Sequence, residues 1–223
     1  AASDSQQGSL KHFKLNEGDF YELEIASWLH DCGKITTPEH VVDKATKLEK
    51  KFDRIHLLEA RAEILKRDVL IEHLRRQIEH CGDDQMNEPD KLKAEYQQAI
   101  QQIDADLDFL KQCNLGSEFM STHDQEHVKS IARRSWRSTH GENKPYLDED
   151  EISNLCIAKG TLNPQERKII NQHISTTIRM LNALPFPKHL KNVPELAGGH
   201  HERMDGKGYP KGLTREQMSV QAR

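Results

Sequence analysis

The sequence predicts an all-α protein, and three observations support this prediction. Apolar residues recur at steps of three or four over long stretches, which is the spacing of amphipathic helices. No stretch shows the convincing alternation of apolar and polar residues that indicates a half-buried strand. Charged residues make up 30% of the 223 residues and aromatic residues only 5%, a composition that long solvent-exposed helices explain.

The first predicted helix lies in residues 18–34, GDFYELEIASWLHDCGK. Leu23, Ala26 and Leu29 form an apolar stripe at helical spacing. Gly33 follows this stripe, and glycine commonly stands where a helix ends. We therefore expect a short buried helix that ends near Gly33.

Two long helices are predicted next, over residues 48–82 and 89–116. Their apolar positions recur at helical spacing, in the first helix at Phe52, Ile55, Leu58, Ala62, Leu65, Val69, Leu70, Leu74 and Ile78, and in the second at Leu92, Tyr96, Ile100, Ile103, Leu107 and Leu110. A turn signal, GDDQMNEPD, joins them. The two helices should form an antiparallel coiled-coil hairpin in which each buries its stripe on the other.

Further helices are expected on both sides of residue 150. THDQEHVKSIARRSW, residues 122–136, predicts one, and LNPQERKIINQHISTTIRMLNAL predicts a second with Asn163 as its cap and Pro164 at its first position. A short helix near Leu196 should then deliver His200 and His201. The final SVQAR also resembles part of a helix, so we expect the chain to be a fragment of a longer protein.

Charge, cysteine content and hydropathy exclude several classes of protein. A formal net charge of -4 argues against non-specific binding to DNA. Four separated cysteines without a CxxC pair fit reduced thiols and a cytoplasmic location. No apolar run is long enough to cross a membrane, so no membrane contact by this fragment is expected, although the parent protein can still be membrane-anchored.

Five residues are candidate metal ligands. His30 and Asp31 stand in HDCGK, His173 lies on the flank of the predicted helix after Pro164, and His200 and His201 open HHERMDGKGYP. Neutral imidazole and carboxylate together suit a first-row divalent metal. Taken singly, a His-Asp dipeptide is more often a surface pair, and a histidine such as His173 is more often part of the core.

Three motifs, in this order, resemble those of the HD-GYP family within the HD phosphohydrolase superfamily: HDCGK, LNPQERKIINQH and HHERMDGKGYPKGL. The resemblance covers about residues 20–44 and 157–223. It implies an HD-type helical bundle whose first part is residues 1–44 and whose second part, truncated at its C-terminus, is residues 157–223. Residues 45–156, with the hairpin and an extra helix, would then be an insertion.

The resemblance implies a metal-dependent phosphodiesterase that hydrolyses cyclic di-GMP to the linear dinucleotide or GMP. The five candidate ligands would hold a di- or trinuclear centre, with iron or manganese as the expected metals, and Asp31 and Lys34 would take part in catalysis. Glu202 is expected to orient one imidazole. The loop formed by Asp205, Gly206, Lys207, Gly208, Tyr209 and Pro210 would contact the substrate or dock a GGDEF-type diguanylate cyclase.

Other functions stay open from the sequence. The family has further ligands upstream of its HD motif and an aspartate downstream that these residues do not supply, which would suit a degenerate module that binds cyclic di-GMP or a GGDEF partner without turnover. A general HD nucleotidase is a third alternative, which the GYP loop disfavours. The inserted helices are expected to form a homodimer or to couple a sensory domain to the site; a passive spacer is the alternative.

Overall fold

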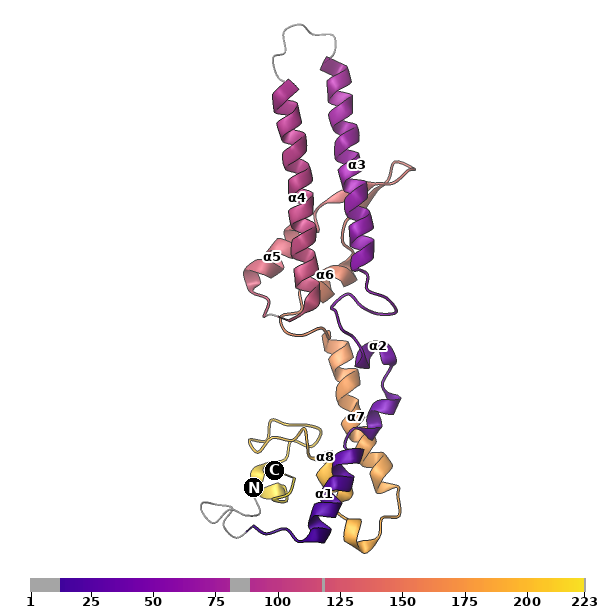
Figure 1. The fold of residues 1–223 in the computed structure, drawn as a ribbon, viewed down its shortest axis with the longest axis vertical. Coiled ribbons are helices and arrows are strands. Elements are labelled where there is room, and N and C mark those ends of the chain that lie inside the picture. Colours follow the sequence, from indigo (N-terminus) through magenta and orange to yellow (C-terminus); the bar gives the residue numbers. More distant parts are fainter. Residues whose placement is uncertain (1–12, 81–88, 118, 223) are drawn as a thin grey trace. The chain divides into compact units, whose positions relative to one another are not determined.

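The computed structural model describes residues 13–80, 89–117 and 119–222, and it divides into two compact units. One unit combines residues 1–42 with 164–223, and the other is residues 43–163. Helices form nearly all the regular structure of the described residues (Figure 1), which confirms the all-α prediction. The predicted insertion stays a prediction, because a division into compact units does not show which unit was inserted.

The 43–163 unit is built on two antiparallel helices that run side by side (Figure 1). Its elements are α3 (Ile55–His80), α4 (Pro89–Leu115), α5 (Thr122–Ile131), β1 (Ser135–Arg137), β2 (Asn143–Pro145) and α6 (Glu149–Leu155). Leu58, Leu110 and Leu155 lie fully buried in a core to which α3, α4, α5 and α6 all contribute. The turn predicted between the two long helices lies largely outside the described residues.

The predicted start of the first long helix was wrong, because α3 begins at Ile55 rather than Leu48. Asn114, near the end of α4, accepts a hydrogen bond from the Leu48 backbone N–H at 2.8 Å and donates its amide to Asp53 at 2.9 Å. These long-range bonds hold the segment before α3 as a loop. Phe52, assigned to the buried stripe, is 55% exposed.

The far end of the hairpin also differs from prediction. Leu70, Leu74 and Ile78 were expected to pack on α4, yet all three are exposed. The facing positions there are polar, since His73 stacks on Tyr96 with ring centroids 4.9 Å apart. The apolar seam between the helices is therefore confined to the end near the other elements of this unit.

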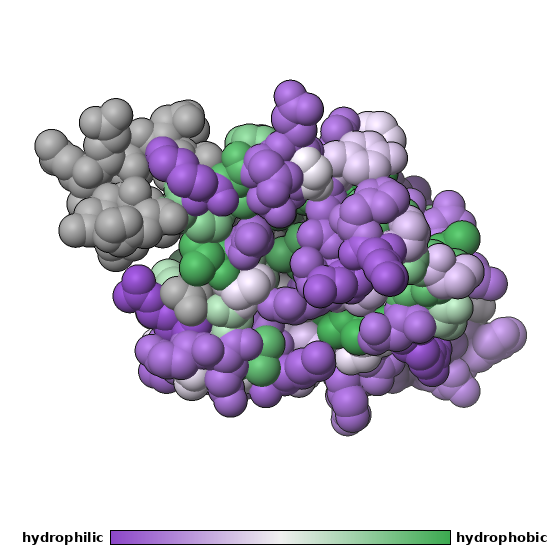
Figure 2. All heavy atoms as spheres, turned by 90° about the horizontal axis from the view of Figure 1, so that it is seen from below, coloured by the Kyte–Doolittle hydropathy of each residue, from purple (hydrophilic) through white to green (hydrophobic). Residues whose placement is uncertain are grey.

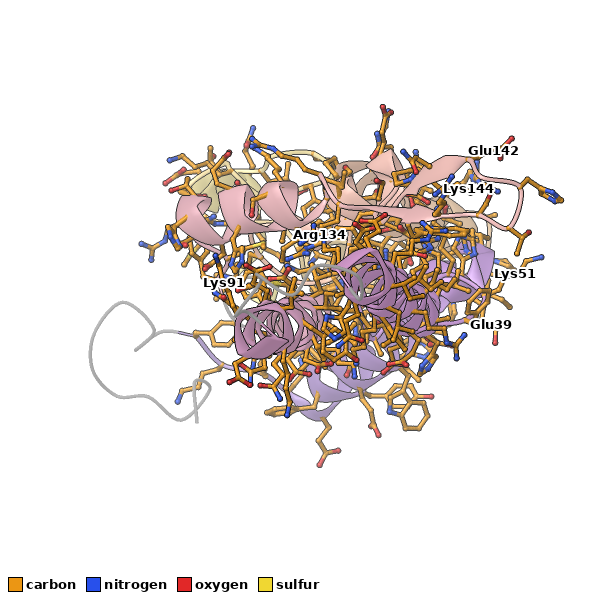
Figure 3. All side chains as sticks on the ribbon, turned by 90° about the horizontal axis from the view of Figure 1, so that it is seen from above. Glu39, Lys51, Lys91, Arg134, Glu142 and Lys144 are labelled. Carbon is orange, nitrogen blue, oxygen red and sulfur yellow. The ribbon has the colours of Figure 1, made fainter. Side chains whose placement is uncertain are left out.

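A small antiparallel sheet replaces the end of the helix predicted over residues 122–136. α5 ends at Ile131, and Trp136 in β1 pairs with Lys144 in β2. Viewed along the hairpin, the segment with Arg134, Glu142 and Lys144 lies to one side of α3 and α4 (Figure 3). Strands of three residues are too short for alternation to reveal them in a sequence.

The other unit contains every candidate site residue. Its elements are α1 (Glu17–Leu29), η3 (Cys32–Thr36), α2 (Glu39–Val42), α7 (Pro164–Asn182), η4 (Lys188–Leu190), α8 (Val193–Gly198) and η5 (Arg215–Gln217), where η denotes a 3-10 helix. After η5, residues 220–222 form turns, so the helix expected at SVQAR was wrong for the described residues.

Helices α1, α7 and α8 pack on one another around a small core. Ala26, Leu181, Val193 and Ala197 form its buried centre. The buried carboxylate of Glu22 on α1 accepts hydrogen bonds from the backbone and side-chain nitrogens of Asn192, at 2.7 and 3.0 Å. Buried polar groups are costly unless they are hydrogen-bonded, so this pair fixes the start of α8 against α1.

The surface is largely hydrophilic on the face shown in Figure 2, where hydrophobic residues form small separate areas. Among the described residues, no helix combines the length and the apolar character that crossing a membrane requires.

Alkaline pH is expected to destabilise the 43–163 unit through Cys113. Burial raises the pKa of its thiol from 9.0 to about 11, so above pH 9 the unfolded chain loses the proton first and the free energy of unfolding falls. Between about pH 9 and pH 11, the free energy of unfolding of Cys113→Ala should therefore fall by on the order of 1–2 kcal/mol less than that of the unchanged protein.

Urea titrations at several pH values measure this difference. Burial acts on Lys47 in the opposite direction, lowering its pKa, so Lys47 contributes stability that rises with pH and the comparison with the Cys113 variant isolates the thiol. If the free energy of unfolding fell equally in the two proteins, the Cys113 thiol would not be the cause of the fall.

Candidate metal centre

A sharp turn between α1 and η3 carries His30 and Asp31. The turn lies against α7, because the backbone N–H of Gly33 donates to Thr177 Oγ1 at 2.9 Å. A Cβ atom at Gly33 would lie only 2.1 Å from the carbonyl oxygen of His173. Only glycine fits this contact, which brings Asp31 next to His173.

Helix α8 delivers the histidine pair in a similar way. A Cβ atom at Gly198 would lie 2.6 Å from Ile178 Cγ1 on α7. The small residues at the end of α8 therefore let the chain approach α7 closely before His200 and His201, which follow in a turn.

Backbone carbonyls orient three of the four histidines. Nδ1 of His30 lies 2.5 Å from the carbonyl oxygen of Ser27, and Nδ1 of His200 lies 2.7 Å from that of Ala197. His173 Nδ1 makes the same contact with Ile170, again three residues earlier. Because a carbonyl only accepts, each Nδ1 carries the proton, and each Nε2 keeps the lone pair that binds a metal.

Those Nε2 atoms converge on the carboxylate of Asp31. His30 Nε2 lies 3.1 Å from Oδ2, while Nε2 of His173 and His200 lie 3.2 and 3.7 Å from Oδ1. Two sets of three ligand atoms each lie within 4.8 Å of one another, one from His173, His200 and His201 and one from His30, Asp31 and His200. His200 belongs to both sets, so all five predicted ligands come together.

Two atoms at the centre are buried without a hydrogen-bond partner, Asp31 Oδ1 and His173 Nε2. With Nδ1 protonated, both are acceptors, and two lone pairs facing each other at 3.2 Å need a cation between them, either a proton or a metal ion. The convergence of further imidazoles favours a metal ion, so the donor set fits one.

The electrostatics keep the ligands in the form that binds metal. Burial alone would raise the pKa of Asp31, but the hydrogen bond from Lys34 and the positive charge of Lys34 lower it below its usual value. Burial lowers the pKa of His200 and His201, and for His201 the neighbouring His200 lowers it further. The carboxylate is thus ionised and these imidazoles are neutral near neutral pH.

Lys34 lies at the rim of the centre. Its Nζ donates to Asp31 Oδ2 at 2.7 Å, and its side chain is 42% exposed. A positive charge so close to the ligands can also reach an anionic group bound there.

The expected role of Glu202 was wrong. Its two carboxylate oxygens accept from the backbone N–H groups of Lys211 and Leu213, at 2.7 and 2.8 Å, rather than from an imidazole. Glu202 therefore holds the loop after the histidine pair. Backbone carbonyls, which sequence motifs do not reveal, orient the rings instead.

The rest of that loop is held by its own contacts. Asp205 accepts from Arg203 at 2.7 Å and from the Lys207 backbone at 3.0 Å, and Gly206 has a positive φ of 74°, which favours glycine. A Cβ atom at Gly208 would lie 2.2 Å from the Arg203 nitrogen.

Tyr209 joins this loop to the metal ligands. Its ring stacks on His201 with centroids 4.7 Å apart and an interplanar angle of 16°. Pro210 follows it and is exposed. The loop therefore forms one edge of the ligand cluster.

Sequence reasoning also missed Thr177. It stands one helical turn after His173 on α7 and is fully buried. Its spacing of four residues from His173 is a signal that both side chains lie on neighbouring positions of one helix face.

The comparison with protein families matches the part of the chain that carries His173, His200 and His201. The family model described as "HD domain" matches residues 150–223. A 3'3'-cGAMP-specific phosphodiesterase 3 from Vibrio cholerae is 35% identical over 74 residues, which is 32% of this chain and 15% of the relative. A cyclic di-GMP phosphodiesterase from Thermotoga maritima is 36% identical over 66 residues, 30% of this chain and 18% of the relative. A search of the solved structures finds no significant match.

Replacing Gly33 with alanine is expected to disrupt the centre. The new methyl group would overlap the α7 backbone, so the free energy of unfolding should fall by about 1–3 kcal/mol, and manganese binding should weaken as Asp31 moves away from His173. Thermal unfolding and metal titration by calorimetry measure both effects.

Ile35→Ala is the matched control, because Ile35 belongs to the same η3 but is 83% exposed. A Gly33→Ala protein with the melting temperature and metal affinity of the control would show that the close contact is not required.

Proposed function

We propose that the protein is a metal-dependent phosphodiesterase for cyclic di-GMP. Its HD-domain match over residues 150–223 and its HD-GYP-like motifs support this proposal. The linear dinucleotide or GMP would be its product. The observation that carries this proposal is the buried pair of Asp31 Oδ1 and His173 Nε2, which has no hydrogen-bond partner and is surrounded by three more imidazoles.

His30, Asp31, His173, His200 and His201 would hold the metal ions in this proposal. The shared position of His200 between two ligand sets supports more than one ion. Imidazole and carboxylate ligands suit iron or manganese. Such ions activate water for attack on a phosphodiester and stabilise the charge that develops on its oxygens.

The chain's own residues would position the substrate. Lys34 supplies a positive charge 2.7 Å from Asp31, where it can approach a phosphate oxygen bound at the centre. The backbone carbonyls behind His30, His173 and His200 keep the rings in place, so the ligand geometry exists before substrate binds.

The choice of substrate rests on the two relatives. Both are named for hydrolysis of cyclic dinucleotides, one for cyclic di-GMP and one for 3'3'-cGAMP. The matched segments cover less than a fifth of either relative, so the activity of the whole protein remains our proposal. Cyclic di-GMP is the proposed substrate, and 3'3'-cGAMP is the natural comparison in the same assay.

Asp31→Ala and His200→Ala are expected to lower metal content and to reduce hydrolysis of cyclic di-GMP more than about a hundredfold. The reason is that Asp31 and His200 each face several other ligands. Elemental analysis of iron and manganese, with chromatography of the products, measures both quantities on the full-length protein. Removal of metal with EDTA should abolish turnover, and added manganese should restore it.

His189→Ala is a suitable control, because His189 lies in η4 outside both ligand sets. A folded protein that holds metal but leaves both cyclic dinucleotides intact would sink the proposed substrate class. A folded protein that binds cyclic di-GMP without metal or turnover would favour the degenerate signalling module.

Docking of a GGDEF cyclase on the GYP loop, homodimer formation through the inserted helices and a cytoplasmic location stay predictions. The exposed Leu70, Leu74 and Ile78 on α3 are the residues to change first in a test of self-association, because exposed apolar stripes on helices often mark interfaces.

A further inference from the structure

A groove lies beside the ligand cluster and contains none of its residues. Six residues of α7 form one wall, and the turn after the histidine pair forms the other. The lining residues are Pro164, Arg167, Lys168, Asn171, Gln172, Ser175, Tyr209 and Pro210. Its volume is about 490 Å³, and it is wide open to solvent.

The groove continues directly from the metal ligands. Tyr209 belongs to both regions, since it lines the groove and its ring stacks on His201. Gln172 also lines the groove and immediately precedes His173 on α7.

The groove residues of α7 and its candidate metal ligand His173 lie on different sides of the helix. Arg167, Asn171 and Ser175 follow one another at four-residue steps along one side of the helix, where Arg167 and Ser175 are exposed and Asn171 is half-buried. His173 points from the buried side and is 3% exposed. Arg167 and His173 are also about 9 Å apart along the helix axis, from a rise of about 1.5 Å per residue, which leaves room for two anionic groups of one ligand.

The chemistry of the lining suits a nucleotide. Arg167 and Lys168 are the cations of the lining set, which has no acidic side chain. A guanidinium binds phosphate oxygens through two parallel hydrogen bonds. The amides of Asn171 and Gln172 can donate to and accept from the edge of a base.

We propose that this groove binds the second nucleotide of a cyclic dinucleotide while its other phosphate lies at the metal ligands. Arg167 and Lys168 would hold the phosphate that is not cleaved, and Asn171 and Gln172 would contact the base. This inference rests on the proposed function and deepens it, because the groove would distinguish dinucleotides from simple phosphodiesters.

The test compares two substrates of the manganese-loaded, full-length protein. Cyclic di-GMP has a second nucleotide, and bis(4-nitrophenyl) phosphate does not. For Arg167→Gln and Lys168→Gln, the ratio of kcat/KM on cyclic di-GMP to kcat/KM on bis(4-nitrophenyl) phosphate should fall about tenfold, mainly through KM, from the loss of a charge-assisted hydrogen bond. Arg179→Gln is the matched control, because Arg179 is an exposed arginine of α7 outside the groove.

The outcomes separate this inference from the proposed function. If this ratio is unchanged in both variants, the groove does not bind the second nucleotide, whereas the proposed phosphodiesterase activity is unaffected. If only bis(4-nitrophenyl) phosphate is hydrolysed, a cyclic dinucleotide is not the substrate and the groove does not bind its second nucleotide.

If the protein hydrolyses neither compound, binding of a fluorescent 2'-labelled cyclic di-GMP tests the groove. Binding that Arg167→Gln weakens about tenfold, and Arg179→Gln does not, would retain the groove in a module without turnover. Absence of binding would overturn both proposals.

Discussion

The contact between Gly33 and α7 is the constraint on which the ligand cluster depends. The Gly33 backbone approaches the carbonyl of His173 so closely that a side chain would not fit, and its N–H donates to Thr177 Oγ1. Only Cys32 separates Gly33 from Asp31, so the carboxylate has little freedom to move away. A ligand from the first part of the chain is thereby held against one from α7.

Backbone carbonyls then give the cluster its orientation. His30, His173 and His200 each place Nδ1 against the carbonyl three residues earlier. The same local contact on three different elements directs three Nε2 atoms at Asp31. Ligands held by the backbone need little rearrangement when an ion binds, which is the usual advantage of a supported metal site.

The loop after the histidine pair connects the cluster to its surroundings. Glu202 holds this loop through two backbone N–H groups, and Tyr209 stacks on His201 at its other end. Tyr209 thus contacts a candidate ligand and also lines the neighbouring groove. The loop residues thus serve the site through their backbone contacts as much as through their side chains.

Local patterns in the sequence determined the helical character of the chain and the five residues that converge. HDCGK, the helix with His173 and HHERMDGKGYP carry their information within a few residues, and short-range spacing is what periodicity and motifs record. Only the tertiary structure decided that α3 starts at Ile55, that Glu202 holds a loop and that a groove lies beside the cluster. These features depend on contacts between residues distant in the sequence, such as Asn114 with Leu48, and packing selects such contacts.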